Sequence, residues 1–172
     1  MRLVGKRVAL APGAAPEDYF VVESDDWAMI CPRTADGRFI MVEQYRPALD
    51  ARLVEFPAGR IDPGETAAAS VRRELIEETG HRVVRLTTLG GFFADTGRLN
   101  NRAHLFFAEV APVRDWTPEP GVDAAAYTAD EIDRMVAGRR LGLHHVALWQ
   151  FVTAAGLDRR TGRTPRSTRR RP

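Results

Sequence analysis

Three glutamates, Glu74, Glu77 and Glu78, lie close together in one short stretch of the chain. If the stretch is helical, their carboxylates lie within about 100° of one another around the helix axis. One interpretation is a solvated acidic face, with an i,i+4 ion pair between Arg73 and Glu77. The other is a site for a hard divalent cation such as Mg²⁺, which prefers oxygen ligands and is often shared with substrate phosphates.

The residues around these glutamates predict the helix that would position them. Pro63 and Gly64 interrupt regular structure. The hydroxyl of Thr66 can accept a hydrogen bond from an unpaired backbone N–H at a helix start, and Gly80 suits the left-handed conformation past a helix end. A core-facing apolar stripe is formed by Ala68, Val71 and Leu75. The sequence therefore predicts about four helical turns, with the glutamates on a face beside the buried stripe.

The stretch from Gly59 to Gly80 resembles the signature of the Nudix hydrolases, a family that cleaves nucleoside diphosphates linked to another group. The matching positions are Gly59, Glu65, Arg73, Glu74, Leu75, Glu77, Glu78 and Gly80. His81 departs from the pattern, which usually has an aliphatic packing residue there. The resemblance implies an α/β fold, the Nudix-type α/β/α sandwich with a mixed β-sheet.

The same resemblance implies a set of roles for the helix residues. Glu74, Glu77 and Glu78 would hold Mg²⁺, with Mn²⁺ as an alternative ion, and Arg73 and Glu77 would belong to the catalytic machinery. Glu65 lies nine residues before Glu74, about 180° around an ideal helix. We therefore expect Glu65 to support the preceding loop by pairing with Arg73, outside the metal cluster.

Two short motifs before the helix resemble the ADP-ribose pyrophosphatase branch of the family. They are Gln44-Tyr45-Arg46 and Glu55–Gly59. By this likeness Arg46 would hold a diphosphate, which suits its planar guanidinium; the alternative is a salt-bridged residue at a strand end. The backbone carbonyl of Ala58 would be a metal ligand, exposed in a Pro-Ala-Gly turn, because hard cations accept backbone oxygen.

Relatives in that branch are homodimers in which an N-terminal segment reaches the partner subunit and its aromatic residues stack on the base. The candidates here are Tyr19, Phe20 and Trp27, with packing in the core as the alternative. Arg98 and Arg102 are candidates for contacts with phosphate or ribose. Their loop lacks the proline that the branch commonly has there, because Thr96 replaces it, and this leaves the sugar open.

The general base is expected outside the helix, in the acidic loop Asp115–Asp123. Metal-bound carboxylates are poor proton acceptors, and the ADP-ribose branch has its catalytic glutamate in a loop at this place. Glu119 lies nearest to that position, and Gly121 stands where a second acid often follows. The alternative is a plain exposed loop acid between Pro118 and Pro120.

Length and composition predict a single globular domain without a membrane span. The chain has 172 residues, 44% of them hydrophobic, which is enough for one globular domain, expected over residues 1–157 with N-terminal strands within 5–23. Cys31 is the only cysteine and lies in an apolar run, so we expect a buried thiol and a cytoplasmic protein. No apolar run reaches the length of a membrane span.

The charge is divided unevenly along the chain. Residues 158–172 contain seven arginines and one aspartate, a charge of +6, so the remaining 157 residues carry −4 of the net +2. This basic tail is low in apolar residues and is predicted to be disordered. It is the only feature that favours nucleic acid as a partner.

Apolar and turn patterns predict a mixed set of strands and helices. We expect strands at 7–10, 19–22, 27–31, 38–45, 52–56, 83–93, 103–110 and 124–127. Asp36-Gly37 predicts a hairpin turn between the third and fourth strands. Further helices are expected at about 129–137, opened by a capping box from Thr128 to Glu131, and at 144–155.

The resemblance to the ADP-ribose branch implies Mg²⁺-dependent hydrolysis of a small nucleoside diphosphate sugar, with ADP-ribose giving AMP and ribose 5-phosphate. The alternatives within the family are GDP-mannose, a dinucleoside polyphosphate or a capped RNA end. A nucleotide-sensing module that binds without cleaving is the alternative of another class, and the intact set of three glutamates argues against it.

Overall fold

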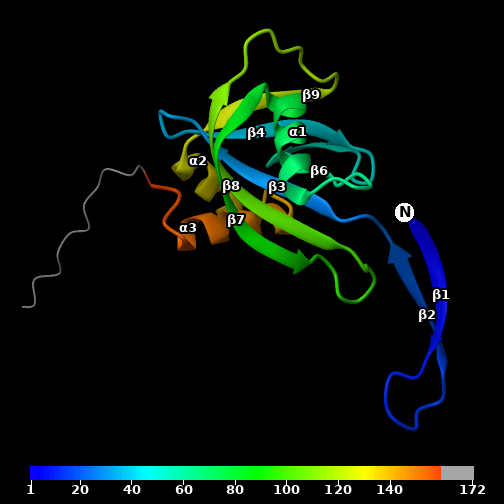
Figure 1. Cartoon of the computed structure of the whole chain (residues 1–172). Helices are drawn as coiled ribbons and strands as arrows, with labels where there is room; N and C mark the ends of the chain where they lie inside the picture. Colours follow the sequence, from blue (N-terminus) through cyan, green and yellow to red (C-terminus); the bar gives the residue numbers. More distant parts are fainter. Residues whose placement is uncertain (160–172) are drawn as a thin grey trace, which may run out of the picture.

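The computed structural model describes residues 1–159 and contains a two-stranded hairpin and a mixed seven-stranded sheet (Figure 1). The strands are β1 (Arg2–Val8), β2 (Glu17–Glu23), β3 (Trp27–Arg33), β4 (Phe39–Arg46), β5 (Ala51–Glu55), β6 (Ala58–Arg60), β7 (His81–Phe93), β8 (Arg102–Pro112) and β9 (Val122–Tyr127). The helices are α1 (Ala67–Thr79), α2 (Ala129–Ala137) and α3 (Leu143–Ala154). Disorder is predicted for the basic tail, residues 158–172, of which 160–172 lie outside the described residues.

The centre of the sheet is the parallel pair β3 and β8. Successive side chains of a strand point to opposite faces, and both strands are apolar on both faces, as expected of strands covered on two sides. Ala28 and Ile30 of β3 belong to one core, together with Phe106 of β8. Met29 and Cys31 belong to a second core on the other face.

Helices cover both faces of this sheet (Figure 1). Val71 and Leu75 of α1 are fully buried in the first core. Ile132 of α2 and Leu148 and Trp149 of α3 are fully buried in the second. The predicted α/β/α sandwich with a mixed sheet is confirmed.

The helix boundaries follow the predicted capping residues. The Thr66 hydroxyl accepts a hydrogen bond from the Ala69 N–H at 3.2 Å, and Gly80 ends α1 in the left-handed conformation at φ 66°. Thr128 and Glu131 form both bonds of the predicted capping box of α2. Local sequence is sufficient here because each capping contact spans only three or four residues.

Several strand predictions are wrong in detail. The first strand runs from Arg2 to Val8, earlier than the predicted 7–10. β3 and β4 meet only at Arg33 and Phe39, since β4 pairs instead with β5 and β9. The Pro-Ala-Gly segment is not a turn, because Ala58 begins strand β6, which pairs with β3. Alternating apolar residues identify a strand but not its partner, which is a long-range choice.

The antiparallel β1–β2 hairpin projects from the body of the molecule (Figure 1). Its links to the body include hydrogen bonds from the Val22 N–H to the Arg98 carbonyl and from the Ser24 N–H to Asn100. Across residues 1–159, none of the helices has the length and apolar character needed to cross a membrane.

Candidate active site on the α1 face

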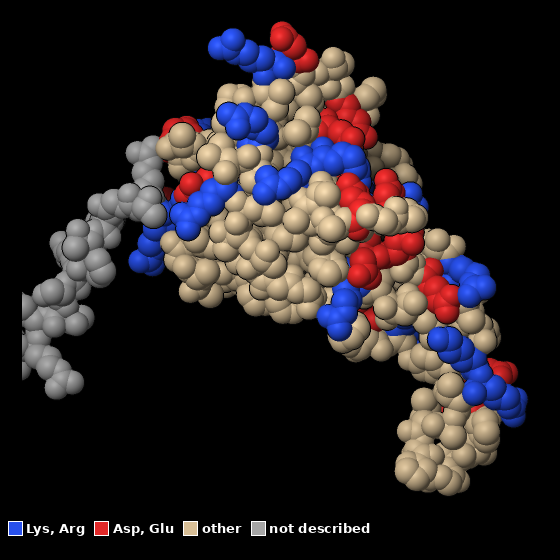
Figure 2. All heavy atoms as spheres, viewed as in Figure 1, with Lys and Arg blue, Asp and Glu red and all other residues tan. Residues whose placement is uncertain are grey.

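Arg73 is the hub of the charged residues on α1. Its guanidinium lies 2.7 Å from Glu74, 3.1 Å from Glu77 and 3.1 Å from Glu65. The predicted pairing of Glu65 with Arg73 is confirmed, and it ties the 60–66 loop to the helix. Figure 2 shows acidic side chains gathered over this side of the body, with arginines between them.

Glu78 is the most buried carboxylate of the group, with 5% of its surface exposed. Burial raises the pKa of Glu78 to about 8, and the negative charges of Glu74 and Glu119 add to this effect. The hydrogen bond that Glu78 accepts from the Ala58 N–H at 3.2 Å acts in the opposite direction, because it stabilises the charged form. Burial likewise raises the pKa of Glu74. Carboxylates that are costly to ionise together are stabilised by a cation placed between them.

Gly59 is in close contact with Glu74. A Cβ atom built on Gly59 would lie 2.0 Å from the Glu74 carboxyl carbon, a distance that real atoms do not adopt. The backbone φ of Gly59 is not positive, so this position does not require glycine for its backbone conformation. The absence of a side chain lets the Glu74 carboxylate lie against strand β6.

A cavity of about 430 Å³ opens beside this strand. Predicted site residues Trp27, Arg46 and Ala58 line it. Its other lining residues are Met29, Ala48, Leu49, Leu53, Glu55, Gly59, Gly142, His144 and His145. A concave surface with apolar walls and a few convergent polar groups is typical of a small-molecule site.

Arg46 is held at the cavity by Glu55. The Arg46 Nε lies 2.8 Å from Glu55 Oε2. Arg46 is therefore salt-bridged at a strand end, as the alternative interpretation expected, and it also lines the cavity. Sequence reasoning did not assign Glu55 or His145 to the site. Glu55 belongs to a motif that was recognised, but His145 lies 89 residues from Phe56, to whose backbone N–H it is hydrogen-bonded, and no local signal marks it.

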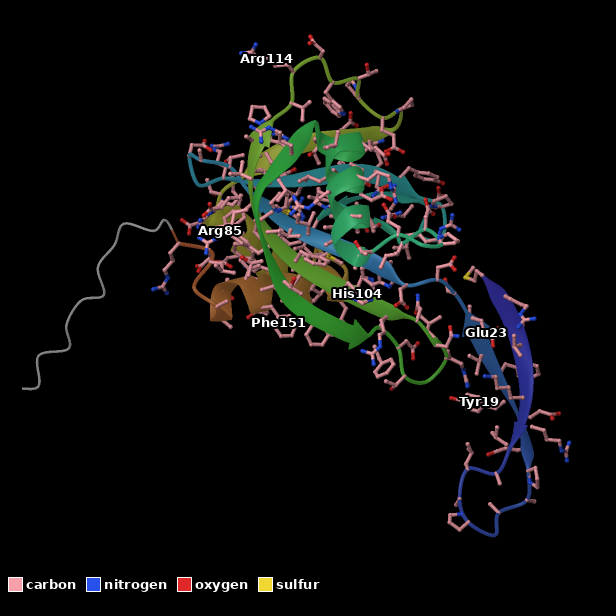
Figure 3. The ribbon with its side chains drawn as sticks, in the orientation of Figure 1. Tyr19, Glu23, Arg85, His104, Arg114 and Phe151 are labelled. Carbon is pink, nitrogen blue, oxygen red and sulfur yellow. The ribbon has the colours of Figure 1, made fainter. Side chains whose placement is uncertain are left out.

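Glu119 is the acidic-loop residue whose charge reaches the buried glutamates. Its negative charge contributes to the raised pKa of both Glu74 and Glu78. Asp123 instead forms an ion pair with Arg52, and Asp115 occupies a left-handed turn at φ 58°. The loop carrying them rises above the sheet, with Arg114 near its tip (Figure 3).

Four predicted substrate-binding residues lie away from this cavity within the chain. Tyr19 is on the projecting hairpin (Figure 3), where its hydroxyl donates to the Gly97 carbonyl and the Arg98 guanidinium lies 4.8 Å from its ring centre. Phe20 is exposed on the same hairpin. Arg102 stacks on Phe93 at 4.2 Å. Their roles toward a substrate stay predictions.

The carboxylates of Glu74, Glu77 and Glu78, here called the α1 cluster, are oxygen donors that suit a hard cation. Within residues 1–159 no three Asp, Glu, His or Cys side chains already converge on one point as metal ligands, because Glu74 and Glu77 turn toward Arg73. Glu78 nevertheless offers a buried carboxylate with one backbone partner, beside two further carboxylates that disfavour its ionisation. Oxygen donors of this kind are the ligands that Mg²⁺ prefers.

Comparison with known proteins identifies the family. A sequence model of the NUDIX domain matches residues 25–146, which include the whole seven-stranded sheet, α1 and α2 but not the β1–β2 hairpin. The chain belongs to the Nudix family. The Nudix signature thus runs from strand β6, where Gly59 packs against Glu74, through the 61–66 loop to the end of α1.

The Nudix relatives include enzymes acting on nucleotide sugars. The chain is 32% identical over 112 residues to an ADP-ribose pyrophosphatase of Bacillus subtilis (strain 168), covering 63% of this chain and 60% of that protein. It is 32% identical over 130 residues to a GDP-mannose pyrophosphatase of Klebsiella pneumoniae, covering 69% of this chain and 65% of that protein. Each match therefore spans less than two thirds of the relative's length.

A solved structure supports the Nudix fold. The crystal structure of an ADP compounds hydrolase superposes with a TM-score of 0.74 and covers 88% of this chain and 91% of that chain. Sequence identity over the superposition is 18%, so the likeness concerns the fold.

Proposed function

We propose that this Nudix protein hydrolyses the diphosphate bond of a nucleoside diphosphate sugar, with ADP-ribose converted to AMP and ribose 5-phosphate. The observation that carries the proposal is the position of the Arg46 cation and the Ala58 backbone on one cavity, with Glu78 hydrogen-bonded to Ala58. The 32% identity to an ADP-ribose pyrophosphatase supports this choice of substrate.

We propose that Glu74, Glu77, Glu78 and the Ala58 carbonyl hold Mg²⁺, or Mn²⁺ in its place. A divalent ion there would neutralise charge on the phosphate oxygens and lower the pKa of the attacking water. Arg73 forms ion pairs with Glu74 and Glu77 and keeps both carboxylates on one side of α1.

The chain's own residues supply the remaining requirements of the reaction. Arg46 provides a fixed cation for the diphosphate, with its planar donors matched to phosphate oxygens. Glu119 is the proposed general base, which accepts a proton from the attacking water. Trp27 and Leu53 give the cavity an apolar wall beside Arg46.

The substrate assignment is tested with a panel of nucleotides at fixed Mg²⁺. We expect AMP and ribose 5-phosphate from ADP-ribose, with kcat/KM at least tenfold above that for GDP-mannose, dinucleoside polyphosphates and capped RNA. GDP-mannose is the second candidate, because a GDP-mannose pyrophosphatase is a relative of similar identity. Rapid turnover of nucleoside triphosphates with none of ADP-ribose would overturn the assignment.

Gly59→Ala is expected to impair cation binding with little loss of stability. The added methyl group must displace the Glu74 carboxylate, which is the mobile end of a side chain, so the backbone need not move. We expect at least a tenfold weaker Mn²⁺ affinity, measured by the paramagnetic signal of the free ion, and a Tm within a few degrees of wild type. Gly13→Ala in the hairpin loop is a poor control because φ is positive there; Ala14→Gly is a better one.

We also propose that the protein is a homodimer. The hairpin exposes Leu3 and Phe20, and the body exposes Phe93 and Leu143. Phe93 and Leu143 line the same apolar hollow of the body; contiguous exposed apolar surface is typical of a protein–protein contact, and an isolated two-stranded hairpin is marginally stable. Light scattering should give twice the mass of the 19.2 kDa chain, and deletion of residues 1–23 should give a monomer; a monomeric full-length chain would contradict the proposal.

A further inference from the structure

Two buried polar side chains of the cavity lining, those of His145 and Glu55, form a series of contacts that ends on Arg46. His145 lies in the first turn of α3 with 3% of its surface exposed, and Glu55 ends strand β5 with 7% exposed. Buried polar groups of this kind are costly unless their hydrogen bonds are satisfied. Neither residue belongs to the metal-holding cluster, so its burial needs another explanation.

The contacts of His145 show which ring nitrogen accepts a hydrogen bond. The backbone N–H of Phe56 donates to the His145 Nδ1 at 3.1 Å. Because a backbone N–H can only donate, Nδ1 is the accepting nitrogen, and the proton of the neutral ring resides on Nε2. That nitrogen lies 3.4 Å from Glu55 Oε1, so the ring presents a donor to the carboxylate.

Glu55 transmits this arrangement to Arg46. One carboxylate oxygen faces His145, and the other accepts from Arg46 Nε at 2.8 Å and from Gln44 Nε2 at 3.2 Å. Although burial opposes its ionisation, the contacts with His145 and Arg46 lower the pKa of Glu55 to about 2. The carboxylate is therefore charged at neutral pH and holds one edge of the guanidinium.

The other edge of Arg46 is available to a ligand. The Arg46 side chain is 42% exposed and lines the cavity. Its Nη1 has no hydrogen-bond partner within residues 1–159, whereas Nε and Nη2 are both bound by Glu55. A guanidinium fixed along one edge presents its remaining donors in a defined direction, which reduces the entropy lost when a diphosphate binds.

We propose that His145 is a positioning residue, which acts through Glu55 to orient the Arg46 guanidinium toward the diphosphate. This inference rests on the proposed function, because it assigns Arg46 a phosphate to hold. A small displacement of a positioned charge is enough to lose an order of magnitude or more in rate. His145 therefore affects the reaction without touching the substrate's reacting atoms.

The test compares His145→Phe with His145→Gln. Phenylalanine keeps the ring volume and removes both the acceptor for Phe56 and the donor for Glu55. Glutamine retains one acceptor and one donor on its amide. We expect kcat/KM for ADP-ribose to fall about tenfold or more in His145→Phe and to recover to within about threefold of wild type in His145→Gln. His104→Phe is the matched control, since His104 likewise pairs with a carboxylate, Asp26, but lies outside the cavity with its side chain 28% exposed.

A double-mutant cycle with Arg46 separates positioning from general stability. If His145 acts through the guanidinium, His145→Phe should change kcat/KM less than twofold in an Arg46→Ala background. Additive losses in the double variant, or an equal loss in His104→Phe, would overturn the inference.

A direct readout keeps the inference separate from the identity of the substrate. The Arg46 Nε–H signal in ¹⁵N NMR spectra, assigned with Arg46→Lys, should exchange slowly with water in wild type and His145→Gln and at least tenfold faster in His145→Phe. Unchanged exchange in His145→Phe would refute the positioning role. If wild type hydrolyses no ADP-ribose, the proposed function fails, and the exchange measurement alone decides whether His145 holds Arg46.

Discussion

Glu78→Gln is expected to lower kcat by about 10²–10³-fold while the fold stays intact. The substitution keeps the size and polarity of the side chain but removes the charge that a divalent cation requires. A bound metal contributes several kcal/mol of charge stabilisation in reactions of this class. Steady-state kinetics at saturating Mg²⁺ measures the loss. Activity equal to wild type would return Glu78 to a merely structural role.

Although Glu78→Gln should lower kcat, it should raise the stability of the protein in the absence of a divalent cation. The pKa of Glu78 is raised from its ordinary value of 4.5 to about 8, so the folded state binds a proton that the unfolded state releases. This contribution to stability is fully present below pH 4.5 and is lost as the pH rises to 8. Glu78→Gln carries no ionisable group there, so its stability relative to wild type should increase across that window, by up to about 5 kcal/mol.

Denaturant unfolding in EDTA between pH 5 and 9 measures this difference. Mg²⁺ should then stabilise wild type more than Glu78→Gln, because the ion binds the folded state. Glu109→Gln is the matched control, since Glu109 is a partly buried glutamate whose partner is Arg33, outside the site. If Glu78→Gln and Glu109→Gln show the same pH dependence, the raised pKa of Glu78 is refuted.

Glu119→Gln is expected to lower kcat by about 10² or more, the usual effect of removing a general base. Glu119 is the acid of its loop whose charge acts on Glu74 and Glu78. The glutamine variant should bind Mn²⁺ within a fewfold of wild type, because the charge of Glu119 opposes the ionisation of the cluster.

Two aspartates of the same loop provide the controls. Asp123 pairs with Arg52, and Asp115 sits in a left-handed turn that asparagine also accepts. Asp115→Asn and Asp123→Asn should keep kcat within about threefold of wild type. A loss confined to Asp123→Asn would mean that the loop is correct and the residue wrong. Three variants near wild type would place the base within the α1 cluster.

The position of Glu119 depends on how its loop is anchored to α1. The Trp116 indole N–H donates to the Glu77 carbonyl at 3.2 Å, and the Val113 N–H donates to the Gly80 carbonyl at 2.8 Å. A Cβ atom on Gly80 would lie 2.5 Å from the Trp116 ring. Gly80 therefore ends the helix and also leaves room for the side chain that fixes the loop.

The sequence by itself determined the parts of this protein that depend on short-range contacts. Helix α1 begins after Thr66 and ends at Gly80 because capping contacts join residues three or four apart. The apolar runs of β3 and β8 are strands, and their apolar character on both faces required a sheet covered on both sides. The spacing of Glu74, Glu77 and Glu78 on one helix likewise follows from 3.6 residues per turn.

Only the tertiary structure decided which distant residues meet. Strand pairing brought β6 against β3 and turned a predicted loop at Ala58 into a strand beside Glu78. Packing of α3 placed His145 on Phe56 and Glu55, and thereby behind Arg46. These contacts join residues tens of positions apart, and their formation depends on burial and on the closure of long loops, which periodicity and spacing do not encode.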